Sequence, residues 1–391
     1  MSDSFTETET VGCFTQLKDS IKGVAVGVLM VLVSFPVLFI NEWNAVTEAK
    51  GIKEVAANVV SVSSDKIDKG NDGKLIHTSG DAKVEEAAVD TKLLVTDEGA
   101  IKIIRTTEIY QWVEETKTET EKKTGGKKEK KKTTTYKKEW VKAPIDSSKF
   151  KKQKKHTNSS SRWDDSLASK DFTAKKVSVG AFDLPGGLIS KVSGGEALSV
   201  TKKQAKAIKD TIGKVKVKAG NFYLGDPDEA NIGDIKISFE VVKADKLSFI
   251  AQQEGDALVE YKAGNDRSYM WLSKGVKNAD QMVSDAESGL AVLTWFLRVF
   301  GWLLMFGGIT MVFKPLVVIA DVIPFIGSML ETGITIFAGL GSFGVSFITI
   351  SIAWIFFRPL IGIPLCLCGV VSLGGLVVLG VVMAKKKKAA A

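Results

Sequence analysis

Hydrophobic residues are concentrated in two stretches, one near the N-terminus and one across the last quarter of the chain. The first stretch, residues 23–40, contains 18 residues without a charge. About 20 residues in a helix cross the ~30 Å of a bilayer's hydrocarbon. We therefore predict a transmembrane helix at 23–40 after a cytoplasmic tail at 1–22. The alternative, a cleaved signal peptide, is less favoured because acids precede the run and no small-x-small cleavage pattern directly follows it.

Three further apolar runs follow in the last quarter, at residues 290–313, 332–357 and 360–384. Each is long enough for a helix to cross a bilayer, so the pattern predicts four spans in total. The connector at 314–331 is moderately apolar and is expected to be cytoplasmic, with a short interfacial or re-entrant piece as the alternative. A basic cytoplasmic tail is expected at 385–391.

The basic residues beside the predicted spans indicate the orientation. Positively charged residues near span ends favour the cytoplasm. The lysine run at 385–388 gives this signal strongly, and Lys18 and Lys22 give it weakly. Four spans place both termini on one side, so the two signals agree and residues 41–289 are predicted to be lumenal.

The region between the spans alternates between apolar and polar positions, which is typical of half-buried strands. Within 234–241 every second residue is apolar, and 247–251 repeats the pattern. Glycine, asparagine and aspartate clusters at 225–228 and 264–266 indicate turns. We therefore predict an α+β membrane protein with four transmembrane helices and a large, mostly antiparallel β lumenal domain. One unit and two packed subdomains both stay open.

Composition locates the charge in one insert. The net charge is +8, and residues 115–155 contain 16 lysines against six acids, or +10, so the remainder carries about −2. This Lys-rich insert, taken as 115–160, is expected to be a hairpin tip or a disordered excursion. A solvated loop is its favoured interpretation, ahead of binding to an acidic partner or anionic lipid and of a nuclear localisation signal. Because the positive charge is confined to this insert, the charge distribution does not indicate a nucleic-acid-binding protein.

The sequence predicts no catalytic, cofactor-binding or metal-binding residues. Only two histidines exist, His77 in an expected turn-rich region and His156 in an expected solvated position of the insert. The carboxylates at 164–165 and 226–229 could bind calcium, but surface turns are favoured there. The three cysteines lie outside the middle domain, so that domain has no disulfide.

Two residues are candidate modification sites. Asn158 begins an Asn-Ser-Ser glycosylation pattern, which a lumenal location would expose to modification. Cys13 lies just before the first span and is a candidate for palmitoylation, with a buried small residue as the equal alternative.

The apolar zone also contains charged residues, which are costly to bury in a membrane, and several glycines. The span-associated charges are Arg298, Asp321, Glu331 and Arg358. The two arginines lie near predicted span ends, so we expect them to act as interfacial anchors. Glycines between 339 and 375 would let helices approach closely, and packing within the chain is favoured over a homo-oligomer.

Several segments resemble the LUMA (transmembrane protein 43) family, in order and through nearly the whole chain. They are Phe35-Pro36-x-x-Phe39-x-Asn41-Glu42, Glu108-Ile109-Tyr110-Gln111-Trp112-Val113-Glu114, Gly187-Leu188-Ile189-x-Lys191-Val192, Gly220-Asn221-Phe222-Tyr223, Ala251-Gln252-Gln253-x-Gly255-Asp256, Thr294-Trp295-x-x-Arg298 and Ala353-Trp354-x-Phe356-x-Arg358-Pro359-Leu360. The chain departs from the family in its Lys-rich insert and its lysine-alanine C-terminus.

The resemblance implies a non-enzymatic scaffold of the endoplasmic reticulum membrane and inner nuclear membrane, with a role in nuclear envelope organisation. Lamin- and emerin-type proteins are the partners it implies. The alternative function is a channel or transport component of an internal membrane, because three spans with embedded charges cluster together. A lumenal enzyme is the third and least favoured hypothesis.

Overall fold

The computed structural model describes residues 3–123, 127–357 and 359–389. It is an α+β protein with antiparallel sheets, as predicted. The chain forms two compact units. The β unit comprises Met1–Phe5, Gly51–Thr116 and Thr134–Asp285, and the helical unit comprises Thr6–Lys50, Lys117–Thr133 and Ala286–Ala391.

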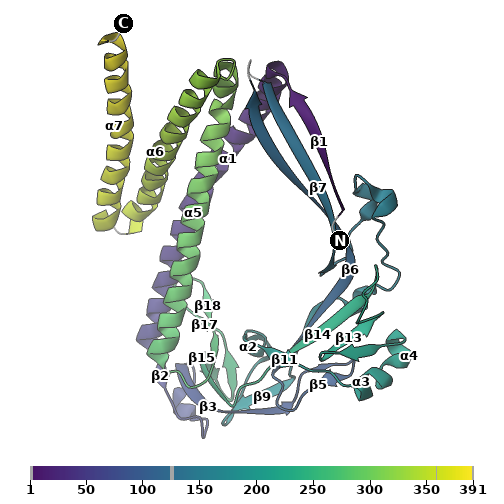
Figure 1. The fold of residues 1–391 in the computed structure, drawn as a ribbon. Helices are drawn as coiled ribbons and strands as arrows, with labels where there is room; N and C mark the ends of the chain where they lie inside the picture. Colours follow the sequence, from purple (N-terminus) through teal and green to yellow (C-terminus); the bar gives the residue numbers. More distant parts are fainter. Residues whose placement is uncertain (1–2, 124–126, 358, 390–391) are drawn as a thin grey trace. The chain divides into compact units, whose positions relative to one another are not determined.

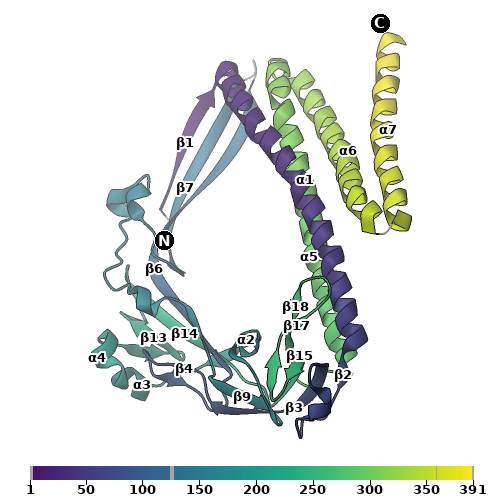
Figure 2. The same ribbon diagram turned by 180° about the vertical axis from the view of Figure 1, so that it is seen from behind.

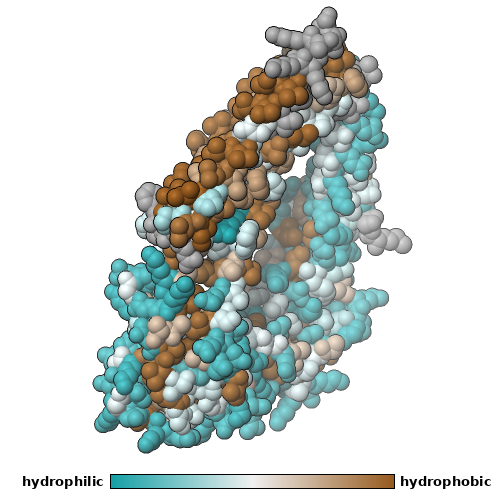
Figure 3. Space-filling model, turned by 90° about the vertical axis from the view of Figure 1, so that its left-hand side faces the viewer, coloured by the Kyte–Doolittle hydropathy of each residue, from teal (hydrophilic) through white to brown (hydrophobic). Residues whose placement is uncertain are grey.

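Long helices dominate the helical unit (Figure 1). They are α1 (Cys13–Asn58), α5 (Ala279–Ala320), α6 (Pro324–Phe357) and α7 (Pro359–Ala389). By length and composition, all four can cross a membrane. The helices α1 and α5 run side by side in both Figure 1 and Figure 2, and α6 and α7 pack together as a helical hairpin. Figure 3 shows that this C-terminal hairpin presents a largely hydrophobic surface.

The segment expected to connect the second and third spans is mostly helical. Helix α5 continues through Pro315 to Ala320, and α6 begins at Pro324, so only a short turn separates the two helices. Proline is tolerated in membrane helices because neighbouring groups satisfy the freed carbonyl. The residues at which each helix enters the bilayer stay predictions.

Glycines allow the closest contacts between these helices. A Cβ on Gly27 of α1 would lie 2.7 Å from the Gly308 carbonyl oxygen of α5, and one on Gly308 would lie 2.6 Å from the Gly27 oxygen. In the same way, a Cβ on Gly344 of α6 would lie 3.1 Å from the Gly369 oxygen of α7. These glycines serve packing within the chain, since each backbone approach leaves no room for a side chain.

Two mostly antiparallel sheets account for most of the β structure. The first sheet contains, in spatial order, β1 (Asp3–Val11), β7 (Lys127–Val141), β6 (Lys102–Lys123), β14 (Ile235–Val242), β13 (Asn221–Leu224) and β12 (Lys216–Lys218), with β8 (Lys170–Thr173) beside β6 and β11 (Glu196–Leu198) beside β14. The Lys-rich insert therefore forms a long hairpin from β6 and β7, with its tip in the helical unit.

The second sheet lies wholly within the β unit. Its order is β10 (Phe182–Asp183), β9 (Lys176–Val179), β3 (Leu75–Glu86), β15 (Lys246–Glu254) and β16 (Ala257–Val259), with β19 (Trp271–Lys274) beside β15 and β2 (Val60–Ser61) beside β3. Short ribbons join β4 (Val89–Asp90) to β5 (Val95–Thr96) and β17 (Tyr261–Lys262) to β18 (Ser268–Tyr269). Short helices complete the unit: α2 (Gly186–Ile189), α3 (Lys202–Ala207) and α4 (Lys209–Ile212).

Each sheet has its own hydrophobic core. Strand β14 shows why the sequence folds this way: its alternate residues from Ile235 to Val241 are buried, while Lys236 and Glu240 are not. Burying one face of each strand supplies the main favourable free energy of such a sheet. The predicted alternation is confirmed, and the two cores lie within one compact unit.

Candidate functional site: a charged clamp between membrane helices

A glutamate, an arginine and a tryptophan from three helices meet inside the helical unit. Arg298 of α5 donates from Nε to Glu42 Oε1 at 2.6 Å and from Nη2 to Glu42 Oε2 at 2.8 Å. Trp354 of α6 donates from Nε1 to the same Glu42 Oε2 at 2.6 Å. We call these three residues the clamp, because one carboxylate of α1 holds both partner helices.

The carboxylate of the clamp is fully buried, and its two partners are partly buried. The Glu42 side chain has no exposed surface, and that of Arg298 is 18% exposed. Two charges removed from water need a close, fully bonded arrangement, and a two-point arginine–carboxylate pair supplies it. Beside the clamp, Asn41 Nδ2 donates to the Thr294 carbonyl oxygen at 3.1 Å, which adds a second bond between α1 and α5.

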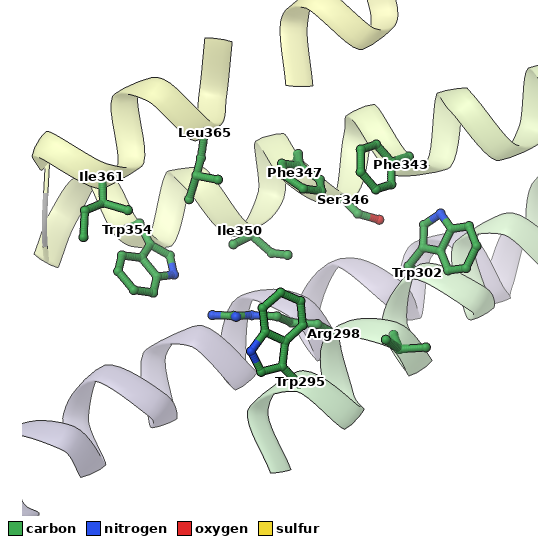
Figure 4. A pocket seen from close by; sticks show the side chains of 11 residues that line it. Trp295, Arg298, Trp302, Phe343, Ser346, Phe347, Ile350, Trp354, Ile361 and Leu365 are labelled. Atoms are coloured by element: carbon green, nitrogen blue, oxygen red, sulfur yellow. The ribbon is translucent and has the colours of Figure 1, made fainter. Parts of the chain in front are cut away.

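An apolar groove borders the clamp (Figure 4). Its volume is about 390 Å³, and its walls come from α5, α6 and α7. Aromatic rings form much of the lining, with contributions from Trp295, Trp302, Phe343, Phe347 and Trp354. The Arg298 guanidinium carbon lies 4.8 Å from the centre of the Trp295 ring, within cation–π range.

The structure places Arg298 in a different environment from the one that the sequence predicted. The sequence predicted an interfacial anchor, whereas the side chain is paired with Glu42 inside the helical unit. Sequence reasoning missed Glu42 and Trp354. The available signal was that an arginine within an apolar run needs a counter-charge, and that Glu42 directly follows the first apolar run.

The other span-associated charges lie apart from the clamp. Glu331 accepts from Lys314 Nζ at 3.1 Å, and both side chains are about half exposed. Asp321, in the turn between α5 and α6, lies 3.4 Å from Lys128 Nζ near the tip of the β6–β7 hairpin. Arg358 lies outside the described residues.

The Lys128–Asp321 ion pair bears on the predicted membrane sides. The N-terminal strand β1 also contacts this hairpin, where Glu9 accepts from Lys132 Nζ at 2.9 Å. Paired residues outside the hydrocarbon lie on the same side of a bilayer, since an open sheet does not cross it. While these contacts form, the insert, the N-terminal tail and the connector lie on one side of the membrane. The insert therefore cannot be lumenal if the tail and the connector are cytoplasmic.

Asn158 uses its side-chain amide within the β unit. Its Nδ2 donates to the Trp112 carbonyl oxygen at 2.9 Å, and its Oδ1 accepts from the Trp112 backbone N–H at 2.7 Å. This two-point bond ties the loop after the hairpin to strand β6. A glycan attached to Nδ2 would disturb the hydrogen bond from Nδ2 to the Trp112 carbonyl oxygen. Glycosylation at Asn158 stays a prediction, and it would cost the β unit this bond.

Cys13 is the first residue of α1, and its Sγ lies 3.8 Å from the Val318 carbonyl oxygen of α5. The thiol is half-buried rather than fully exposed. The contact agrees with the alternative of a small residue packed between helices, and palmitoylation stays a prediction.

His156 is buried against aromatic rings, in contrast to the solvated position expected from its basic surroundings. Its ring stacks on Tyr136 with centroids 3.7 Å apart, and Nδ1 lies 3.0 Å from the Lys152 carbonyl oxygen. The Tyr136 hydroxyl donates to Glu114 Oε2 at 2.5 Å. Burial, with a smaller contribution from the Glu114 carboxylate, raises the pKa of Tyr136 to about 12.

His77 is also buried and is not in a turn. It lies in strand β3, where Nδ1 is 3.1 Å from the Ser61 Oγ and Nε2 is 2.8 Å from the Lys277 carbonyl oxygen. Both ring nitrogens are therefore occupied by structural hydrogen bonds. The sequence misassigned the two histidines because short basic or Gly-flanked segments carry no signal of what packs on them.

The candidate calcium carboxylates are paired with lysines. Asp226 accepts from Lys216 Nζ at 2.8 Å, and Asp228 accepts from Lys218 Nζ at 2.7 Å. The Lys216 bond is the main cause that lowers the pKa of Asp226 to about 2. Within residues 3–123, 127–357 and 359–389, no cluster of three His, Cys, Asp or Glu side chains could hold a metal.

A polar cleft of about 820 Å³ lies beside these carboxylates in the β unit. Its buried carboxylate, Asp234, forms an ion pair with Arg162 and accepts from the backbone N–H of Asp226 at 3.1 Å and of Asn231 at 2.8 Å. These bonds fix the turn between β13 and β14. The carboxylate therefore acts as a structural acceptor for the loop.

Comparison with known proteins links the chain to one family. A family model described as Transmembrane protein 43 matches residues 109–359. The chain is 28% identical to transmembrane protein 43 of Mus musculus over 370 residues, and that alignment covers 89% of this chain and 88% of the relative. It is 28% identical to the Homo sapiens protein over 368 residues, with the same coverage.

A more distant relative shows the same full-length match. The Drosophila melanogaster homologue is 25% identical over 355 residues, which cover 88% of this chain and 91% of the relative. No solved structure matches the chain. Segments that carry the clamp, Asn41-Glu42, Thr294-Trp295-x-x-Arg298 and Ala353-Trp354, are among those that showed the resemblance in the sequence. The chain is a membrane protein of the transmembrane protein 43, or LUMA, family.

Proposed function

We propose that this chain is a non-enzymatic, multi-pass scaffold that organises protein complexes at the endoplasmic reticulum and inner nuclear membranes. The observation that carries the proposal is the clamp. It uses the charges of Glu42 and Arg298 to hold α1, α5 and α6 together. A fixed set of helices suits an anchor that presents a large β unit to other proteins.

The same pairing weighs against the alternative of a channel or transporter. A charged permeation path needs groups that exchange partners with ions. Here Arg298 is bound to Glu42, Glu331 to Lys314 and Asp321 to Lys128. Asp321, in the turn between α5 and α6, and Glu331 of α6 also lie apart from the clamp, so these charges do not converge on one path.

Family membership supports the membrane assignment, and the partners and compartments are our proposal. By family resemblance, lamin- and emerin-type proteins are the partner class. The paired carboxylates and hydrogen-bonded histidines of the β unit favour a binding role over catalysis, since each is engaged in a structural bond.

Proximity labelling of the full chain in its host cell tests the scaffold. We expect enrichment of endoplasmic reticulum and nuclear envelope proteins over an unrelated membrane anchor that carries the same labelling enzyme. The Glu42→Gln variant should lose part of that enrichment, because its helices are held less firmly. A labelled set that matches the unrelated anchor would contradict the proposal, and ion flux in liposomes with the purified protein would favour the channel.

A further inference from the structure

A second basic surface lies in the β unit, where the low net charge outside the insert conceals it. Residues 202–218 contain seven lysines against one acid, or +6. All seven lysines are exposed. We call them the lysine face: Lys202, Lys203, Lys206, Lys209, Lys214, Lys216 and Lys218. They come from α3, α4, β12 and the turn before β12, and α3 and α4 lie beside β13 in both Figure 1 and Figure 2.

Two local periodicities turn these lysines outward. In α3 and α4, the apolar side chains of Ala205, Ile208 and Ile212 are three or four residues apart and pack in a hydrophobic core of the β unit, so the lysines between them face water. At β12, Val215 and Val217 alternate with lysines and pack against the same core. The lysine face is therefore a folded surface and not a disordered charge run.

Five lysines of the face have no carboxylate partner in the described part of the chain. Only the two in β12 form ion pairs, with Asp226 and Asp228. In addition, Lys202 and Lys206 of α3 are four residues apart, a spacing at which like charges destabilise a helix. A ligand that brings negative charge would relieve this repulsion, so the lysine face is suited to an anionic partner.

The chemistry of the surface favours an acidic protein segment over nucleic acid or a membrane. Residues 202–218 contain no arginine and no aromatic ring on which a base could stack. They also expose no large apolar side chain that could enter a bilayer. The polar cleft of about 820 Å³ borders the lysines, and it is lined by Lys214 and Lys216 together with the apolar side chains of Ile212 and Leu224. Such a cleft accommodates a side chain of an extended peptide, which a flat membrane surface does not supply.

We propose that the lysine face binds an extended acidic segment of a partner protein. Aspartate and glutamate side chains of the segment pair with the five lysines that have no counter-charge, and one apolar side chain enters the cleft beside Ile212. The proposal rests on the scaffold function proposed above and deepens it, since it names the surface and the chemistry of the partner. Binding should weaken as the salt concentration rises, because salt screens exposed ion pairs.

Fluorescence anisotropy with the full-length protein in phosphatidylcholine nanodiscs tests this proposal. The probe is a fluorescein-labelled peptide in which a leucine is flanked on both sides by glutamates, and the control peptide has glutamine at every glutamate position. We expect saturable binding of the acidic probe and none of the control. Single-stranded RNA and phosphatidylserine vesicles are added as competitors at equal charge. No saturable binding of the probe, or stronger displacement by either competitor than by unlabelled acidic peptide, would overturn the proposal.

A charge-matched pair of variants connects the binding to the lysine face. One variant carries Lys203→Gln, Lys206→Gln and Lys209→Gln. The other carries glutamine at three insert lysines that already pair with glutamates of the hairpin, namely Lys123, Lys131 and Lys137. We expect the first variant to weaken probe binding about tenfold, as for three exposed ion pairs, and the second to leave it unchanged.

Arginine at the same three positions of the lysine face should preserve the binding, because it keeps the charge. Equal weakening by the two glutamine variants, or none by the first, in protein that elutes as the wild type does in gel filtration, would refute the assignment. These measurements use purified protein, so their failure would be distinct from a failure of the scaffold function, which proximity labelling in the cell decides.

Discussion

Replacement of Glu42 by glutamine tests whether the clamp stabilises the helical unit. The change removes the negative charge from a fully buried position and leaves the Arg298 guanidinium, only 18% exposed, without a counter-charge. Loss of one partner of a buried ion pair costs about 3–5 kcal/mol. A glutamine oxygen still accepts one of the three N–H groups, so we expect about 3 kcal/mol, or roughly a hundredfold fall in the folded-to-unfolded ratio.

The free energy of unfolding is measured by titration with sodium dodecyl sulfate in mixed micelles, followed by tryptophan fluorescence. Glu331→Gln is the matched control, because its ion pair with Lys314 is similarly short at 3.1 Å but 40% and 43% exposed. Exposed pairs contribute about 0–1 kcal/mol. Trp354→Phe removes one charged hydrogen bond and should fall between the two, at about 1.5–3 kcal/mol.

A double variant separates the ion pair from local packing. Arg298→Met leaves Glu42 buried and charged, so it should cost about 3–5 kcal/mol alone. In the combined variant with Glu42→Gln no charge is left unpaired, and the loss should be clearly smaller than the sum of the single losses. Additive losses, or a Glu42→Gln effect no larger than that of Glu331→Gln, would refute the clamp.

Three further predictions concern other parts of the chain. Gly308→Ala should lower the melting temperature in detergent, since its Cβ would lie 2.6 Å from a backbone oxygen of α1, whereas Gly374→Ala, with open space around it, should have no destabilising effect. Tyr136 should titrate near pH 12 in the folded protein, against 10.0 for the free group. Its contribution to stability is therefore present below pH 10 and is lost as the pH rises toward 12. A tyrosinate absorbance change with a midpoint at pH 10 that is absent in Tyr136→Phe would contradict this prediction. Single cysteines placed at Lys128 and Asp321 should react with an impermeant thiol reagent from the same side of sealed microsomes, and labelling from opposite sides would exclude their ion pair.

Strands and helices could be predicted from the sequence where the pattern of apolar and polar residues was strong. The alternation at 234–241 predicts β14, and the runs at 23–40, 290–313, 332–357 and 360–384 each lie within one long helix. The spacing of apolar residues and the length of an apolar run are local features of the chain, so strands and membrane helices can be predicted from the sequence. The extension of α5 through Pro315 was missed, because proline usually ends a helix in water but is tolerated in a membrane helix.

The sequence by itself determined the class of protein: apolar runs long enough to span a bilayer, a cysteine-free β domain, one Lys-rich insert and the segments of a family. Only the tertiary structure decided which charges meet. Glu42 and Arg298 are separated by 256 positions, and Trp354 lies a further 56 residues on, yet one carboxylate binds both. Pairings of this kind depend on how helices cross, which is set by close contacts such as Gly27 with Gly308, and no local pattern encodes them. The burial of His156 and the contact of Lys128 with Asp321 have the same origin, since each depends on a segment distant in the chain.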